Sequence, residues 1–362
     1  MKRILTALLI CGLLLCGAPA VLADEKTPNT RELTIDQAVE LALKHSYSLK
    51  KGQNSIDSAY EARLLSAYRL VGVSVDEREN FQAIRFMSNL QQADARWRSA
   101  KKSVTLVEDS VTYATHKAYT DILLTEANIR LAEVDKKNAE TQRTIAQARY
   151  RVGMSQLLDL EKAEAEVIRT KAALEDAHKT LDNNYLELNY LIGFWPQDRP
   201  VLMDMPEFEK LVVADITSYI ARSLADNPNQ WIKENDIFTA KYALDAYDPS
   251  TSGTSYLGLE IAVDQSILTA EEAKEQYKKS LYSLYNTILK MEENLPTIEQ
   301  NILIAREGLR ITQLMHETGM ATRAEVIAAE TSLVRVEKSR IDLICQHDVQ
   351  KLAFLKPWAI GM

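Results

Sequence analysis

The side chains that most often carry out catalysis or bind metals are few and scattered in this sequence. No two histidines have the spacing of a helical zinc motif. His347 and Asp348 lie close to Cys345, but adjacent residues on one helix point to different faces. The chain also lacks a glycine-rich phosphate loop and a serine nucleophile elbow. We therefore expect no enzyme, no metal site and no cofactor. The five histidines are His45, His116, His178, His316 and His347.

Turn-forming residues are scarce, which indicates the class of fold that must position any functional site. The 362 residues include only 11 Gly and 9 Pro, while 46% are apolar. That share of glycine and proline is about half the usual one. Long helices are expected, and this composition argues against collagen and low-complexity disorder. The net charge of −8 does not suggest a nucleic-acid partner.

The N-terminus resembles a secretory signal peptide. Lys2 and Arg3 precede an uncharged run, and small residues follow up to Ala23. Cleavage after Ala20 or after Ala23 fits the small-residue rule, and an uncleaved anchor or a lipid-modified Cys16 are the alternatives. Cleavage leaves Cys345 as the one remaining cysteine, so no internal disulfide is expected.

The rest of the chain contains two copies of one pattern. One set of residues, beginning with Ile35 and Ile216, recurs at a shift of 181, and a second set, beginning with Tyr119 and Tyr285, recurs at a shift of 166. Three prolines cluster between the copies. We predict a leader over 1–23, a first helical repeat over 24–193, a linker over 194–208, a second helical repeat over 209–356 and a tail over 357–362.

Apolar residues in the first copy recur every seven positions, which predicts a seam for another helix. Such a repeat also predicts that long helices wind around their neighbours, with an ordinary amphipathic core face as the alternative. Thr170 and Asn184 interrupt the intermediate positions. Val326, Leu333 and Leu343 continue the pattern in the second copy, although Arg340 falls on the seam. The regular positions are Leu160, Val167, Leu174, Leu181 and Leu188.

Each copy is expected to form a long helical hairpin whose tip is a glycine. No Gly or Pro occurs from 82 to 152, which allows a helix of ~70 residues and ~105 Å. A glycine in a left-handed conformation can end such a helix. Ser155 and Thr322 are then the expected N-cap residues of the helices that follow the two tips. The predicted tip residues are Arg151, Val152, Gly153, Met154, Thr318, Gly319 and Met320.

These features together resemble the TolC family of outer-membrane efflux and secretion channels. The similarity is carried by the sequence LTIDQAVELA at 33–42, its weaker echo over 215–228, the paired glycine tips and the ending Leu191-Ile192-Gly193. It implies a homotrimer whose twelve helices form a tunnel across the periplasm. It also implies membrane association and two partners, namely a periplasmic adaptor that meets the tips and an inner-membrane transporter that supplies energy.

The resemblance also suggests a gate. Family members often carry acidic residues six and nine positions beyond the second tip glycine, where this chain has Glu325 and Ala328. Three copies of Glu325 would concentrate negative potential in a narrow pore. Asp159 holds the equivalent place in the first copy. A solvated surface role is the alternative for both acids.

The membrane-crossing strands of that family have weak counterparts here. Crossing strands need about 9–11 alternating residues each, and the sequence offers one candidate at 255–263 and a shorter one at 70–75. We therefore expect a shortened relative with the β-barrel missing or vestigial. The predicted fold is mainly α, made of tandem helical hairpins, with at most a short residual β segment near 255–263.

Two functions follow from these expectations. The first is an exported channel component of the cell envelope or periplasm, in the outer membrane if the cell has one, that passes small molecules or polypeptides outward. The second is a coiled-coil structural or tethering protein that conducts nothing. Polar seam residues such as Thr170 and Asn184 are compatible with both functions.

Overall fold

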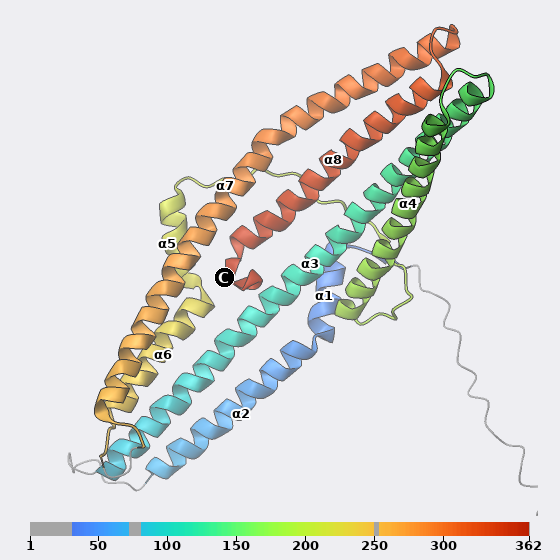
Figure 1. Ribbon diagram of the computed structural model, residues 1–362. Helices are drawn as coiled ribbons and strands as arrows, with labels where there is room; N and C mark the ends of the chain where they lie inside the picture. Colours follow the sequence, from blue (N-terminus) through green and yellow to red (C-terminus); the bar gives the residue numbers. More distant parts are fainter. Residues whose placement is uncertain (1–30, 72–80, 250–252, 362) are drawn as a thin grey trace, which may run out of the picture.

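Long helices make up most of the protein (Figure 1). The computed structural model describes residues 31–71, 81–249 and 253–361, so the predicted leader lies outside the described residues. Within them the strands are β1 (Glu32–Leu33) and β2 (Val201–Leu202), which pair in parallel. The helices are α1 (Ile35–His45), α2 (Tyr47–Leu70), α3 (Phe81–Arg151), α4 (Leu157–Ile192), α5 (Ile216–Asp226), α6 (Pro228–Asp245), α7 (Tyr256–Glu317), α8 (Arg323–Leu355) and the 3-10 helix η1 (Pro357–Ile360).

The helix boundaries repeat at the two shifts found in the sequence. Helix α5 begins and ends 181 residues after α1, and α7 ends 166 residues after α3. Helix α8 begins 166 residues after α4. The predicted mainly helical fold, built from two long hairpins, is therefore confirmed.

The helices lie side by side in a fixed order (Figure 1). At the end that carries the hairpin tips, α3 contacts both α4 and α8, and α8 contacts α7, which gives the order α4, α3, α8, α7. Toward the other end, α2 packs on α3, and α6 lies between α3 and α7. Helices α4 and α2 therefore form one edge of the molecule, and α7 forms the other.

Two hydrophobic clusters hold this arrangement, one in each repeat. The first joins α1, α3 and α4 around Tyr119, Ile122 and Leu188. The second joins α5, α7 and α8 around Ile288 and Phe354. Ile122 and Ile288 occupy equivalent positions and are both fully buried, so the duplicated pattern produces two equivalent cores.

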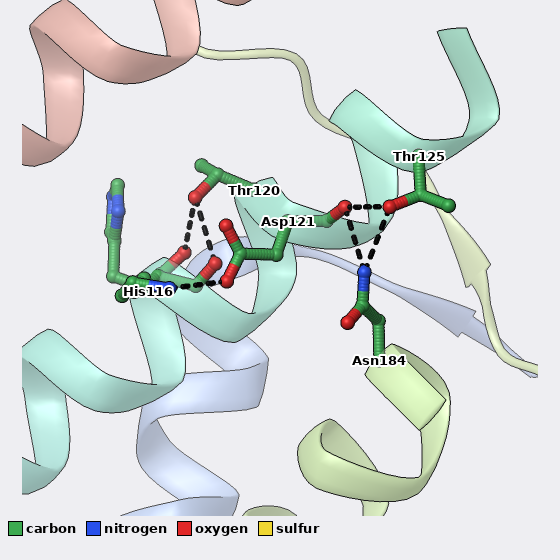
Figure 2. A network of polar contacts seen from close by, with 6 residues as sticks. His116, Thr120, Asp121, Thr125 and Asn184 are labelled. Atoms are coloured by element: carbon green, nitrogen blue, oxygen red, sulfur yellow. Dashed lines mark hydrogen bonds and ion pairs between the residues drawn. The ribbon is translucent and has the colours of Figure 1, made fainter. Parts of the chain in front are cut away.

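The seven-residue seam of α4 faces α3 as predicted. Leu160, Leu174 and Leu181 are partly buried, while Val167 and Leu188 are buried. The polar interruptions are satisfied inside the hairpin. Asn184 donates hydrogen bonds to the Asp121 carbonyl oxygen at 3.2 Å and to Thr125 Oγ1 at 2.8 Å (Figure 2). A partly buried amide bonded across two helices helps to fix their register.

The structure corrects the expectation for 255–263, which is the first part of α7 and not a strand. The Ser255 side chain caps this helix by accepting a hydrogen bond from the Gly258 amide at 3.1 Å. Val263 then begins a line of buried residues at seven-residue intervals with Ala270 and Tyr277. The buried residues of this segment therefore follow the spacing of a helix, although apolar and polar residues alternate locally as in a strand. Residues 72–75 of the other candidate strand lie outside the described residues, and Leu70 ends α2.

One ion pair recurs in both hairpins with its charges reversed. In the first hairpin, Lys171 Nζ of α4 lies 3.8 Å from Glu140 Oε1 of α3. In the second, Arg306 of α7 lies 3.2 Å from Glu337 of α8. Each residue stands 166 positions from its counterpart, so the two hairpins use the same contact with opposite signs.

Candidate functional site

Both predicted tip glycines adopt the left-handed conformation. Gly153 has φ = 74° and Gly319 has φ = 77°. At each tip the next amide donates to a carbonyl five residues back, from Met154 to Arg149 at 2.8 Å and from Met320 to Met315 at 2.7 Å. This is the hydrogen bond of a Schellman motif, which ends a helix at a glycine. Each long helix therefore stops at its glycine and the chain reverses.

At the start of each helix after a tip, the carboxylate at the third position accepts a hydrogen bond from the N-cap amide. Thr322 caps α8 as predicted, but α4 is capped by Gln156 rather than by Ser155. The prediction for Ser155 was wrong by one residue, because Gln156 is the position equivalent to Thr322 at the shift of 166. Aligning the two tips at that shift would have identified it. The Ser155 hydroxyl is buried and has no hydrogen-bond partner.

The two candidate gate acids each hold the third position of the helix that follows a tip. Glu325 Oε2 accepts hydrogen bonds from the Thr322 amide at 2.6 Å and from Thr322 Oγ1 at 2.9 Å. Both bonds hold the pKa of Glu325 below its ordinary value, and the bond from the backbone amide has the larger effect. Asp159 Oδ2 accepts from the Gln156 amide at 3.3 Å. Each carboxylate therefore stabilises the start of a helix in the single chain.

Exposed apolar side chains surround the glycines at both tips. Met154 is 79% exposed, Met320 is 69% exposed and Val152 is 68% exposed. Leu157 and Leu158 extend the exposed apolar surface of the first tip. Neither leucine was among the predicted tip residues. Thr318 and Arg151 are also exposed, so every predicted tip residue is accessible in the single chain.

The two tips lie at the same end of the molecule (Figure 1). Between the middle of the molecule and this end, ion pairs between α3 and α8 link the two hairpins. Arg335 lies 2.9 Å from Asp135, and Lys137 lies 3.0 Å from Glu330. The second tip is also closed by His316, whose Nδ1 lies 2.8 Å from the Ala321 carbonyl oxygen. The fold thus presents two glycine tips together.

The two edges of the molecule carry stripes of exposed apolar residues that the sequence analysis missed. On α7 the spacings of three, four and seven residues place them on one face. The edge formed by α4 and α2 has its own set. By contrast, among the described residues, α8 exposes Leu355 alone of its large apolar side chains, and α3 exposes them only near its two ends. The α7 stripe includes Leu257, Ile261, Leu268, Leu303, Ile304, Ile311, Leu314 and Met315. The opposite edge includes Tyr60, Leu64, Leu65 and Tyr68 of α2, and Leu157, Leu158, Ile168, Leu186 and Tyr190 of α4.

The residues considered for catalysis do not converge on one site. His347 Nε2 lies 3.2 Å from Glu292 of α7, whereas Asp348 lies 3.4 Å from His116 of α3. Neighbours in sequence therefore face different helices, as predicted. Burial raises the pKa of the Cys345 thiol to about 12. Within the described residues no group of three His, Cys, Asp or Glu side chains is placed to hold a metal.

The first repeat matches a known family model. Residues 42–194 match the model of outer membrane efflux proteins, which confirms the resemblance. This range contains the first glycine tip and the repeat ending. The matched range runs from within α1 to just past the end of α4. No sequence among the curated proteins matches the chain. None of the described helices has the length and apolar character needed to cross a membrane.

Solved structures of outer-membrane channels share the fold over nearly the whole chain. The outer-membrane channel OprN superposes with a TM-score of 0.70 at 13% identity, covering 90% of this chain and 89% of that one. The CmeC channel of Campylobacter jejuni gives 0.64 at 11% identity, covering 94% and 91%. The MtrE channel of Neisseria gonorrhoeae, in its open state, gives 0.60 at 15% identity, covering 90% and 88%. At these identities the similarity concerns the fold.

Proposed function

We propose that this protein is an exported channel component of the cell envelope, in which copies of the chain form a closed ring of helices. In this proposal three copies supply twelve helices at the level of the tips. A periplasmic adaptor docks on the tips, and an inner-membrane transporter supplies the energy for outward transport. The match of the first repeat to outer membrane efflux proteins supports the transport role.

The observation that carries this proposal is the pair of unlike apolar edges. A single chain leaves the α7 stripe and the α4 and α2 stripe in water, where exposed apolar surface of this extent is unfavourable. The two stripes differ from each other, so α7 of one copy fits against α4 and α2 of the next in a head-to-tail contact. Repeating such a contact generates a ring when the rotation closes.

The internal repeat supplies a residue pair for testing this contact. Within one chain, Asp135 of α3 meets Arg335 of α8. At the shift of 166, the equivalent residues are Asn301 of α7 and Arg169 of α4, which are both exposed on opposite edges. If α7 of one copy packs on α4 of the next as α3 packs on α8, Asn301 and Arg169 meet across the contact between copies.

A cross-linking experiment tests the ring. We expect the variant Arg169→Cys with Asn301→Cys to give dimers and trimers with a short bis-maleimide, which spans more than a disulfide can. The matched control, Asp135→Cys with Arg335→Cys, should cross-link within one chain and stay monomeric on a denaturing gel. Cys345 is buried and should not react. Monomers alone from the Arg169 and Asn301 variant would overturn the ring, and a filled rod by negative stain would favour the tethering function.

The tips are proposed as the adaptor-docking surface. Met154→Asp and Met320→Asp place charges on exposed side chains, so the fold should tolerate them, while an apolar contact with an adaptor should be lost. Val212→Asp is the matched control, because Val212 is 91% exposed but lies in the segment between α4 and α5. In a host whose drug tolerance depends on this protein, the tip variants should lower tolerance and the control should not. Equal tolerance in all variants would exclude docking through the methionines.

A ring of copies would also bring the candidate gate acids together. Three copies of Glu325, with Asp159 near them, would then repel anions at the narrow end of the tunnel. Efflux of a cationic dye and of an anionic dye from a host that depends on this protein tests this role. Glu325→Gln should reduce selectivity for cations, and unchanged selectivity would leave Glu325 with its capping role alone.

A further inference from the structure

The groove between α2 and α3 is a cavity that is lined by positive and neutral side chains alone. Its volume is about 660 Å³, within the range of small-molecule sites. The lining contains two arginines and no acidic residue. The lining residues are Asn54, Ser55, Ser58, Ala59, Ala62, Ser66 and Arg69 of α2, and Phe86, Asn89, Gln92, Ala93 and Arg96 of α3.

The positive charge of this groove has no ion-pair partner among the residues that the structure describes. Neither Arg69 nor Arg96 forms an ion pair with any residue that the structure describes. The nearest acid in sequence to Arg96 is Asp94, which is fully engaged elsewhere. Its Oδ1 accepts from Arg63 Nε at 2.7 Å, and its Oδ2 lies 2.7 Å from Arg98 Nε. In a chain of net charge −8, two unpaired guanidinium groups facing one cavity favour an anion.

The neutral side chains of the groove indicate which kind of anion fits. Guanidinium groups match the geometry of phosphate oxygens, and the amides of Asn54 and Asn89 supply further donors. The hydroxyls of Ser55 and Ser66 donate to backbone carbonyls at 3.0 Å and 2.9 Å. Their oxygens therefore remain available to accept hydrogen bonds. Donors for a phosphate beside acceptors for hydroxyl groups suit a phosphorylated polyol.

The second repeat lacks this chemistry at the equivalent positions. The residue 166 positions after Arg96 is Ala262, and the residue 181 positions after Ser55 is Asp236. An acid replaces a hydroxyl there, and a methyl group replaces a guanidinium. The positive groove is therefore a property of the first repeat and not a consequence of the duplicated helical pattern.

We propose that the groove between α2 and α3 binds a phosphate group carried on a polyhydroxyl body, with Arg69 and Arg96 holding the phosphate. Both a free sugar or glycerol phosphate and the headgroup of an anionic phospholipid have this chemistry. The proposal does not depend on the channel function, because neither arginine lies at the tips or in the two edge stripes.

Titration calorimetry of the purified full-length protein with glycerol 3-phosphate tests the free ligand, and co-sedimentation with vesicles tests the headgroup. We expect saturable binding of glycerol 3-phosphate, stronger sedimentation with phosphatidylglycerol than with phosphatidylcholine vesicles, or both. Arg69→Gln with Arg96→Gln should weaken that binding at least tenfold, and added salt should weaken it as well. Binding of glycerol 3-phosphate alone assigns a free solute, and binding of the vesicles assigns the lipid.

Arg85→Gln is the matched control. It removes an exposed arginine of α3 that does not line the groove, and it should bind like the unmodified protein. Circular dichroism should show the same helicity in all variants. Absence of saturable binding to both probes would overturn the proposal. The same holds if the groove variant binds as well as the unmodified protein, or if Arg85→Gln weakens binding as much as the groove variant does.

Discussion

Four glycine-to-alanine substitutions test whether backbone conformation or packing governs each glycine. Gly153, Gly193 and Gly319 all have φ between 74° and 79°, which a residue with a Cβ adopts at a cost of about 1–2 kcal/mol. An added Cβ at Gly153 or Gly319 would have no neighbour within 4 Å. Each of these two alanine variants should therefore lose only about 1–2 kcal/mol of unfolding free energy.

Gly193 should be far more sensitive, because an added Cβ would lie only 2.6 Å from Cγ of His45. Such overlap in a packed site costs about 1–3 kcal/mol more, so Gly193→Ala should lose about 2–5 kcal/mol in total. At Gly308 the same substitution should raise the unfolding free energy instead of lowering it. It lies inside α7 with open space around it, so Gly308→Ala should stabilise the helix by about 0.5–1 kcal/mol.

Urea unfolding followed by circular dichroism measures the four values. The protein concentration must be the same for all variants, because assembly would add to the apparent stability. The expected order of stability is Gly308→Ala, then the unmodified protein, then the two tip variants, then Gly193→Ala. Equal losses for Gly153→Ala and Gly193→Ala would refute the contact with His45. Tip variants without any loss would refute the requirement for a left-handed residue at the tips.

Three further predictions concern polar contacts. Lys171→Glu places like charges opposite Glu140 and should lower the unfolding free energy by about 0.5 kcal/mol, since the pair is exposed. Adding Glu140→Lys should restore it, and a double-mutant cycle without recovery would contradict the pairing. Because the pKa of Glu325 is lowered in the folded chain, its contribution is present above the unfolded pKa and is lost as the pH falls through the folded one. The melting temperature of Glu325→Gln should therefore depend less on pH below about 5, and parallel curves would argue against the capping bond. Asn184→Ala should cost about 1–2 kcal/mol; Thr125→Val should add little in that background, and full additivity would show that the two side chains are not coupled.

The sequence was sufficient to predict the parts of the fold that depend on local periodicity. The seven-residue pattern of α4 led to the seam from Leu160 to Leu188, and the position of each tip glycine led to the end of a long helix. Both signals are local, because burial of one face and a left-handed residue depend on a few neighbouring positions. The error at Ser155 came from considering one tip alone.

Other features depended on contacts between distant segments, which periodicity does not report. The candidate strand at 255–263 is helical because Val263, Ala270 and Tyr277 lie on a buried face of α7. The positive groove combines Arg69 and Arg96, which belong to separate helices. The exposed stripe of α7 became recognisable only when the order of the helices showed which face had no partner.

The reversed ion pairs have a consequence for how the chain folds. Two hairpins with one ancestral pattern could exchange partners, so that the face of α3 that meets α4 received α8, and the face of α7 that meets α8 received α4. In the first mismatch Glu140 would face Glu337, and in the second Arg306 would face Lys171. Both mismatches bring like charges together, which is unfavourable on neighbouring helices. The opposite polarity of the two contacts therefore gives each half of the duplicated molecule a means to select its own companion during synthesis.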